Sequence, residues 1–208
     1  MMNAIVPVKA LADSKSRLFP ERDRSDVETL SRMMMVDVIQ CLRAVPGVEL
    51  VVVVTPDPRV ADEASSSGAM AVLHTAPGLN PAIEVAAAKV SGRIDPVLVM
   101  LGDVAAADPG EVAQLIAAAP ERGVALAPSR DGGTSALVRR PHGVIPACFG
   151  RDSAKRHREA AAAAGVPFVE LALPSLAIDV DRADDARAIL AQPTLGERTR
   201  SLLEKWLP

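Results

Sequence analysis

Strand-like and helix-like stretches alternate over the first two thirds of this 208-residue chain, and the alternation restricts the possible folds more than any other feature. Short apolar runs such as Val48 to Thr55 and Val97 to Leu101 are separated by segments long enough for helices. This order is typical of βαβ units, in which helices cover a parallel sheet. Four consecutive valines in the first run suit a strand buried on both faces. We therefore predict an α/β fold with helices on both faces of the sheet.

Cap-and-proline patterns define the predicted helices. A capping box at Ser25 to Glu28 starts a helix that stops before Pro46. A second helix is expected from Pro58 to Ser67, followed by a short strand from Met70 to His74. Asn80 precedes a proline as an N-cap would, which predicts a helix to Val90, and Asp108 does the same for a helix to Ala119.

The pattern changes after about residue 120. Val124 to Ala127 and Ala136 to Arg139 are strand-like and joined by a Gly-rich turn, which predicts a hairpin and hence a mixed, mostly parallel sheet. Further along, Ser153 to Ala164 is predicted as a helix, and Phe168 to Leu173 and Ala177 to Val180 as strands. Two short helices end the chain. We find no repeat or long linker, so residues 1–208 are expected to form a single domain.

Composition narrows the classes of partner. A hydrophobic fraction of 49% is ample for a buried core. The formal net charge of -3 lacks the broad positive surface of proteins that wrap nucleic acid, and with aromatic residues at 2% stacking platforms for single strands are missing. We therefore expect no nucleic acid polymer as a partner, and any anion site must be local.

The cysteines and the apolar runs bear on the type of site and on the location of the protein. Cys41 and Cys148 belong to no CxxC pair and have no His at metal-ligand spacing, so both are interpreted as buried apolar residues. The longest apolar runs are strand-sized, and the first residues lack the pattern of a signal peptide. These features predict a cytoplasmic protein with no membrane partner.

Three cations follow the first apolar strand. Lys9, Lys15 and Arg17 come within nine residues, just after Val8. Because open α/β sheets bind ligands at the carboxyl ends of their strands, a polyanion could bind here. The alternative is a solubilising loop, since Lys and Arg are usually solvated surface residues.

Three aspartates form a candidate metal site. Asp103 directly follows the strand ending at Leu101, while Asp179 and Asp181 alternate on a predicted strand and would share one face. Mg²⁺ binds one or two carboxylates together with waters and phosphate oxygens, so the three suit a metal that carries a nucleotide. The alternatives are an ordinary turn aspartate at Asp103 and a solvated strand end at the other two.

Two glycine-containing segments are candidate phosphate sites. In Arg130 to Thr134 the paired glycines could form an anion nest, with the Thr134 hydroxyl as a further donor. In Phe149 to Ser153 a helix begins, and free N–H groups there favour phosphate. The alternatives are a plain hairpin turn and a Ser153 that caps its own helix. His157 is interpreted as structural, and no Ser-His-Asp or Cys-His arrangement points to an acyl-transfer hydrolase.

Five stretches together resemble a known family. They are PVKALADSKSRL from Pro7, the strand end at Asp103, GGTSAL from Gly132, FGRDSAKRH from Phe149 and IDVD from Ile178. Their order and spacing resemble, over nearly the whole chain, the guanylyltransferases that make the phosphodiester precursor of the deazaflavin coenzyme F420. The resemblance implies a single-domain, Rossmann-like nucleotidyltransferase that joins the guanylyl group of GTP to a three-carbon phosphate acid and releases pyrophosphate.

The resemblance also implies roles for individual residues. The GTP phosphates would be held by Lys9, Lys15 and Arg17, with Asn80 also in the nucleotide site. Mg²⁺ would be bound by Asp103, Asp179 and Asp181, and these three with Lys15 would be the catalytic residues. The acceptor acid, phospholactate, phosphoenolpyruvate or phosphoglycerate, would be held by Thr134, Gly150 and Ser153. The family's usual Asp-Leu-Pro is here Asp103-Val104-Ala105, and its GGTN ends here in Ser135.

The residue inventory suits this chemistry and leaves alternatives. An acceptor phosphate is already ionised near neutral pH, so no general base is needed, and the lack of a poised His is expected. Other readings are another Mg²⁺-dependent nucleotidyl or sugar-nucleotide transferase of the same fold, or a non-catalytic nucleotide-binding relative. The resemblance implies a homodimer, and the apolar segment Leu202 to Leu207 could form an interface or a final core helix.

Overall fold

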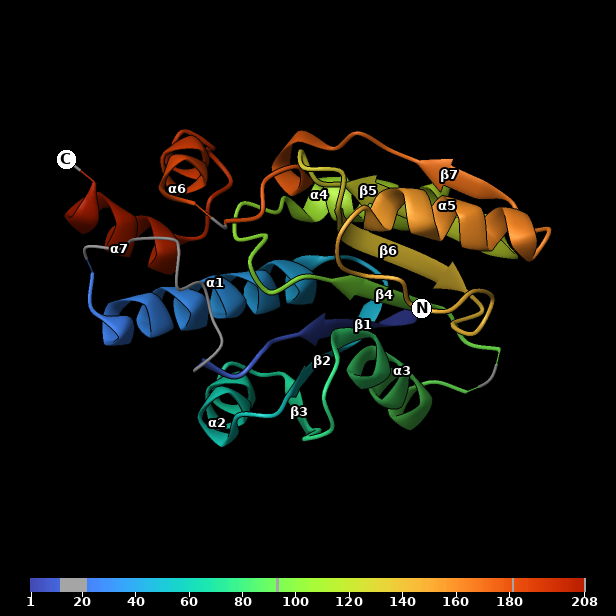
Figure 1. The fold of residues 1–208 in the computed structure, drawn as a ribbon, viewed down its shortest axis with the longest axis horizontal. Coiled ribbons are helices and arrows are strands. Elements are labelled where there is room, and N and C mark those ends of the chain that lie inside the picture. Colours follow the sequence, from blue (N-terminus) through green and yellow to red (C-terminus); the bar gives the residue numbers. More distant parts are fainter. Residues whose placement is uncertain (12–21, 93, 181, 208) are drawn as a thin grey trace.

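The computed structural model describes residues 1–11, 22–92, 94–180 and 182–207. Within them a seven-stranded sheet has the order β3-β2-β1-β4-β6-β5-β7 (Figure 1). The strands are β1 (Met2–Pro7), β2 (Val48–Thr55), β3 (Met70–Leu73), β4 (Val97–Met100), β5 (Gly123–Pro128), β6 (Thr134–Arg140) and β7 (Phe168–Glu170). β6 is antiparallel to both of its neighbours, and the other strand pairs are parallel. The predicted mixed, mostly parallel sheet is confirmed.

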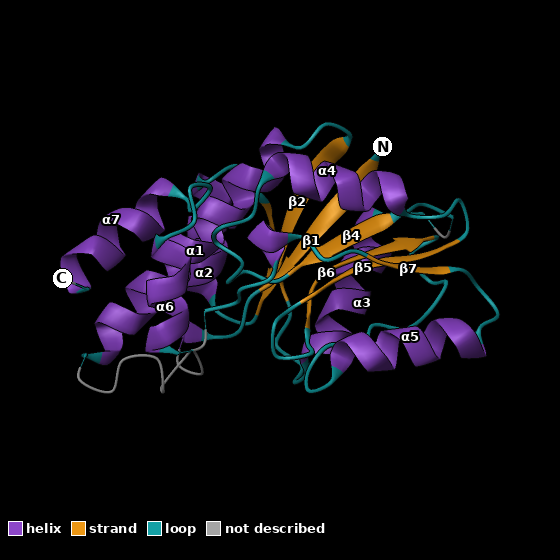
Figure 2. Cartoon of the chain, turned by 90° about the horizontal axis from the view of Figure 1, so that it is seen from above, coloured by secondary structure: helices purple, strands orange, loops and turns teal. Residues whose placement is uncertain are grey.

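Helices cover both faces of the sheet, as predicted. They are α1 (Arg24–Ala44), α2 (Pro58–Ser66), α3 (Leu79–Val90), α4 (Pro109–Ala118), α5 (Ser153–Ala163), α6 (Ala183–Leu190) and α7 (Glu197–Trp206), with a short 3₁₀ helix, η2, at Pro174–Leu176. α1, α2 and α4 pack on one face, and α3 and α5 on the other. Figure 2 shows α4 opposite α3 and α5 across the sheet. None of the described helices is long and apolar enough to cross a membrane.

The central strands are buried on both faces because successive side chains point to opposite sides. In β1, Ala4 and Val6 pack toward α1, whereas Ile5 packs toward α3, and all three are fully buried. The same alternation divides the side chains of β4. The apolar run of these strands therefore reflects two cores, one on each face.

Two helix starts differ from the prediction. α1 begins at Arg24, since the carbonyl of Asp23 already accepts hydrogen bonds from the N–H groups of Asp26 and Val27; the predicted capping box at Ser25 is wrong. α3 begins at Leu79, so Asn80 lies inside the helix and is not its N-cap. Its side chain hydrogen-bonds with the backbone of Phe149.

The end of the sheet also differs. β7 stops at Glu170, short of the predicted Leu173, and residues 177–180 are not a strand. Ile178 and Val180 instead pack in a third apolar cluster with α1, α6 and α7. The shared strand face expected for Asp179 and Asp181 therefore has no basis in the structure, and Asp181 lies outside the described residues. Cys41 and Cys148 are only half-buried, which corrects their interpretation as core residues.

The final helix packs on its own chain. Leu203 is fully buried against α1 and α6, and Leu202 and Trp206 are half-buried beside it. The buried carboxylate of Asp37 accepts hydrogen bonds from the Thr199 N–H (2.8 Å) and hydroxyl (2.6 Å). The apolar residues of Leu202 to Leu207 thus contribute to a core.

Candidate functional site

A cavity of about 390 Å³ lies at the carboxyl edge of the central strands. The chain leaves β1 to build β2 and β3 on one side and then returns to place β4 on the other. Such a reversal of strand order opens a crevice between the loop after β1 and the loop after β4, and open α/β sheets bind ligands in such a crevice. Because β6 is antiparallel, its first residues reach the same edge, and the Leu101 N–H donates to the Ser135 carbonyl there at 3.0 Å.

Six residues predicted from the sequence line this cavity. They come from the loops after β1 and β4, from the first residue of β6, from the loop before α5 and its first residue, and from the segment before α6: Lys9, Asp103, Thr134, Gly150, Ser153 and Asp179. Asn80 is not among the lining residues. Lys15, Arg17 and Asp181 lie outside the described residues.

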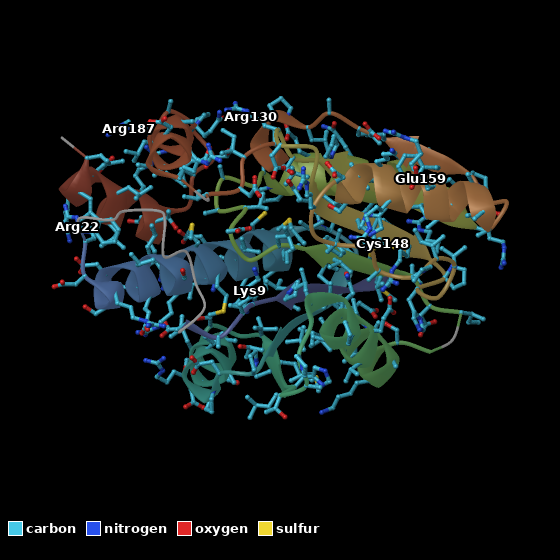
Figure 3. All side chains as sticks on the ribbon, in the orientation of Figure 1. Lys9, Arg22, Arg130, Cys148, Glu159 and Arg187 are labelled. Atoms are coloured by element: carbon cyan, nitrogen blue, oxygen red, sulfur yellow. The ribbon has the colours of Figure 1, made fainter. Side chains whose placement is uncertain are left out.

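One side of the cavity carries the first cation and the first carboxylate. Lys9, labelled in Figure 3, follows β1, and Asp103 follows β4, its neighbour in the sheet. Gly102 permits their close approach, since a Cβ there would lie 3.0 Å from Val8 Cγ2 and 3.5 Å from Val6 Cγ1. A side chain at position 102 would therefore press on Val8, which the glycine before the aspartate avoids.

The loop after β1 is anchored at its last described residue. The Leu11 N–H donates to Asp57 Oδ2 at 3.2 Å, and Asp57 Oδ1 caps α2 by accepting the Arg59 N–H at 2.9 Å. Burial alone would raise the pKa of Asp57, but hydrogen bonds from the Arg59 side chain and from both backbone N–H groups outweigh it and lower the pKa. Asp57 therefore stays ionised as an anchor for this loop.

The carboxylates in the cavity suit a hard cation. Asp103 and Asp179 both line it, and Mg²⁺ needs only one or two carboxylates when phosphate oxygens and waters complete its coordination. Among the described residues no group of three or more His, Cys, Asp or Glu side chains could hold a metal. Two carboxylates would leave most of the coordination sphere of Mg²⁺ to phosphate oxygens and waters.

The predicted anion nest is not available in the β5–β6 turn. The Gly133 N–H donates to Asp131 Oδ1 at 2.9 Å, and the Gly132 N–H donates to the Ser129 carbonyl at 3.1 Å. The pKa of Asp131 is lowered, chiefly by the hydrogen bond from the Ser129 hydroxyl. Burial acts in the opposite direction, and the hydrogen bond from the Gly133 N–H lowers the pKa further. Both glycine N–H groups thus serve the turn, which corrects the expectation that they bind an anion.

The start of α5 uses its N–H groups in a similar way. The Ser153 N–H donates to the Gly150 carbonyl at 3.1 Å, and the Ala154 N–H donates to the Gly132 carbonyl at 3.3 Å. Ser153 is the first helical residue and not the cap, because Asp152 precedes it in a left-handed conformation with φ of 52°. These bonds join the hairpin turn to the helix and leave the side chains to contact a ligand.

Two hydroxyls and a histidine form a buried chain beside the cavity. Ser153 Oγ lies 3.0 Å from Thr134 Oγ1, which lies 3.1 Å from Nδ1 of His157. The Cys148 N–H donates to the other ring nitrogen, Nε2, at 2.9 Å. Burial, followed by the nearby Arg139 charge, lowers the pKa of His157 to about 4. The histidine is therefore neutral near pH 7.

The segment from Ile145 to Phe149 is held by side chains from α3 and β6, in addition to the bond from Cys148 to His157 of α5. Glu84 Oε1 accepts from the Ala147 N–H and from Arg139 Nη1, both at 2.7 Å, and Nη1 also donates to the Ile145 carbonyl at 3.0 Å. Asn80 accepts the Phe149 N–H at 2.8 Å and donates to its carbonyl at 3.1 Å. These bonds position Gly150, the next residue, at the cavity.

The supporting roles of Glu84 and Arg139 were not predicted from the sequence. Arg139 is a fully buried charge that follows the apolar centre of β6, Ala136 to Val138, and Glu84 is the acidic residue of the mostly apolar helix α3. Charged residues are rare at positions that face a core unless they are paired, so Arg139 next to an apolar strand segment and Glu84 in a mostly apolar helix carried a signal. The partner of each could not be read from the sequence.

The chain is similar to known proteins over nearly its whole length. The family model described as guanylyl transferase CofC like matches residues 2–206. The phosphoenolpyruvate guanylyltransferase of Sphaerobacter thermophilus is 36% identical over 195 residues, covering 93% of this chain and 94% of the relative. The protein of the same name from Nocardia farcinica is 37% identical over 212 residues, covering 97% of this chain and 90% of the relative.

Solved structures share the fold at low sequence identity. A structure described as a nucleotide-diphospho-sugar transferase from Desulfovibrio desulfuricans G20 has a TM-score of 0.79 at 17% identity and covers 99% of this chain and 95% of that one. A 4-diphosphocytidyl-2C-methyl-D-erythritol synthase has a TM-score of 0.63 at 15% identity, covering 97% and 98%. With the family model matched from end to end, the chain belongs to the CofC-like guanylyl transferases and is a nucleotidyltransferase.

Proposed function

We propose that this enzyme transfers GMP from GTP to a small phosphorylated three-carbon acid and releases pyrophosphate, as a step of coenzyme F420 biosynthesis. One observation carries the proposal: a single cavity is lined by a first set of charged residues, Lys9, Asp103 and Asp179, and by a second set of two buried hydroxyl residues, Thr134 and Ser153. The first set suits a metal-bound triphosphate and the second an oxyanion acceptor. The names of the relatives favour phosphoenolpyruvate over phospholactate and phosphoglycerate as the acid.

The proposed reaction needs positioning more than proton transfer. An oxygen of the acceptor phosphate attacks the α-phosphorus of GTP, the bond from that phosphorus to the β-phosphate oxygen breaks, and pyrophosphate leaves. The second pKa of a phosphate monoester is about 6, so the nucleophile is already ionised near pH 7. No histidine is among the described residues that line the cavity, which is consistent with this route.

The residue roles follow the two sides of the cavity. Lys9 would contact the GTP phosphates, together with Lys15 and Arg17, the last two proposed from the family resemblance alone. Asp103 and Asp179 would hold Mg²⁺, with Asp181 as the family's third ligand. The metal would neutralise charge on the triphosphate and on the leaving pyrophosphate.

The acceptor side would use the remaining lining residues. Thr134 and Ser153 offer hydroxyl groups, and Gly150 allows close approach of the backbone, with a φ of +117° that favours glycine. Arg151 is exposed at the same cavity and would add positive charge near the acid. Asn80, assigned to the nucleotide by resemblance, contacts Phe149 and would act on the cavity through that loop. The homodimer implied by the family remains part of the proposal.

A base and acceptor screen tests the function directly. Purified protein with Mg²⁺ is given GTP, CTP or UTP with each of the three acids, and pyrophosphate release and product mass are measured. We expect a guanylylated acid from GTP and at least tenfold less product from CTP or UTP. Equal product from CTP would favour a cytidylyltransferase like the structural neighbour, and GTP binding without turnover of any acid would favour a non-catalytic nucleotide-binding protein.

A further inference from the structure

The hydroxyl pair beside the cavity has too few protons to serve both its own hydrogen bonds and a ligand unless His157 supplies one. Thr134 and Ser153 are 2% and 1% exposed, so neither can rely on bulk water. Their mutual bond at 3.0 Å uses one of the two hydroxyl protons. Thr134 and His157 also share a hydrogen bond of 3.1 Å. If the hydroxyl is its donor, this bond uses the second hydroxyl proton; if the imidazole is its donor, the second hydroxyl proton stays free.

The donor in the Thr134–His157 bond is determined by the hydrogen bond at the other ring nitrogen of the imidazole. The Cys148 N–H can only donate, so Nε2 of His157 must be the unprotonated nitrogen. A neutral imidazole then carries its proton on Nδ1, which faces Thr134. Cys148, labelled in Figure 3, therefore fixes the tautomer through its backbone and not through its thiol.

We infer that His157 is a positioning residue that donates to Thr134 from Nδ1 and thereby leaves one hydroxyl proton of the Thr134–Ser153 pair free to bind the acidic acceptor. This inference rests on the proposed function for the ligand class, a small phosphorylated carboxylic acid. Both hydroxyl-bearing residues line the cavity, whereas His157 is fully buried and does not. His157 therefore acts through them and takes no part in the chemistry itself.

The surroundings support a donor role for the hydroxyls. Four of the backbone N–H groups near the hydroxyl pair, those of Gly132, Gly133, Ser153 and Ala154, already donate to protein acceptors. A neutral ring is also maintained, because burial lowers the pKa of His157. Phe149 packs edge-on against the imidazole with 5.0 Å between the ring centroids and holds its orientation.

A matched pair of variants separates the two ring nitrogens. In His157→Asn the amide reaches the position of Nδ1 and can still donate to Thr134, but the bond from Cys148 is lost. In His157→Gln the amide reaches the position of Nε2 and can accept from Cys148, but the bond to Thr134 is lost. Both variants lose the ring that packs on Phe149, so a purely structural role predicts similar effects.

Steady-state kinetics with Mg²⁺, GTP and phosphoenolpyruvate give the first readout. We expect His157→Gln to raise KM for the acid about tenfold, with KM for GTP within twofold and kcat within threefold of the wild-type values, as for loss of one hydrogen bond to a charged ligand. His157→Asn should restore KM for the acid to within threefold. Equal increases in both variants, or an increase in KM for GTP instead, would overturn the inference.

A ¹⁵N spectrum of the imidazoles gives a readout that does not depend on turnover. We expect His157, assigned by its loss in the Gln variant, to show a protonated Nδ1 and an unprotonated Nε2 at pH 7. The opposite tautomer would overturn the inference whatever the kinetics. If the wild type forms no product with any of the three acids, the proposed function fails, and the spectrum still decides whether His157 donates to Thr134.

Discussion

The two sides of the cavity are positioned by different means. On the side of Lys9 and Asp103, the ends of two adjacent parallel strands carry the functional side chains, so the sheet itself brings them together. On the side of Thr134 and Ser153, a segment outside the sheet, Ile145 to Phe149, is held by side chains from α3, β6 and α5. Substitutions near Lys9 and Asp103 should therefore change the rate of the reaction or the binding of GTP. Substitutions in the residues that support Thr134 and Ser153 should change the stability of the protein and the binding of the acceptor acid together.

Asp103→Asn offers the largest test of the first side. The substitution keeps the shape of the side chain and removes the charge that would hold Mg²⁺, so we expect kcat to fall about 10²- to 10³-fold, with stability nearly unchanged. Pyrophosphate release measures the rate, and urea unfolding measures the stability. Asp62→Asn, an exposed position on α2, is the control and should retain wild-type turnover. Unchanged turnover in Asp103→Asn would refute the metal site.

Glu84→Ala offers the matching test of the second side. The variant leaves the Arg139 guanidinium buried without its counter-charge and frees the Ala147 N–H. Glu84 is partly exposed, so we expect a cost at the low end for a broken buried pair, about 3 kcal/mol of unfolding free energy. Glu84→Gln, which keeps the acceptor oxygen, should cost about 1 kcal/mol. Urea unfolding of the three proteins compares them, and equal stabilities would contradict the proposed support of this segment.

The difference between the two sides also explains what could be predicted from the sequence. Strand ends are marked by local patterns, so the positions of Lys9 and Asp103 followed from the βαβ alternation and from a general rule about sheet edges. Glu84 and Arg139 are 55 residues apart in the chain, and their pairing depends on how α3 packs across the sheet. No local pattern encodes that contact.

The errors have the same origin. Asn80 before a proline has the local pattern of an N-cap, but its amide bonds to Phe149, 69 residues away, and the helix begins earlier. The stretch Ile178 to Asp181 alternates like a strand, yet Ile178 and Val180 are drawn into the cluster with α6 and α7. Tertiary packing overrode the local preference in both cases.

The pH dependence of stability should carry the signature of His157 on the second side. Its pKa in the folded protein, about 4, lies below the ordinary value of 6.5. The unfolded chain therefore takes up the proton first as the pH falls, and the free energy of unfolding should drop by on the order of 3 kcal/mol from pH 6.5 to pH 4 and be flat above. Urea unfolding of His157→Gln across this range should lack that part of the drop. Parallel curves would contradict a buried neutral histidine.

Asn80→Ala distinguishes support of the loop from contact with the nucleotide. Because the amide makes two hydrogen bonds with the Phe149 backbone, at 2.8 and 3.1 Å, we expect a loss of about 2 kcal/mol in stability and a higher KM for the acid. KM for GTP should not change. Asn80→Asp keeps the acceptor oxygen and should lose about half as much stability. A raised KM for GTP at normal stability would instead support direct nucleotide binding.

Lys9→Ala gives the smallest effect and the sharpest contrast with the histidine variants. Lys9 is an exposed cation at the cavity, so its attraction for the triphosphate is partly screened, and we expect KM for GTP to rise about tenfold, equivalent to about 1.4 kcal/mol. The increase should shrink at high salt, and KM for the acid should stay within twofold. Lys89→Ala, an exposed lysine at the end of α3, controls for net charge. If Lys9→Ala raised KM for the acid and not KM for GTP, the proposed assignment of the two ligands would be wrong, because the cation would then bind the same ligand as the hydroxyl pair.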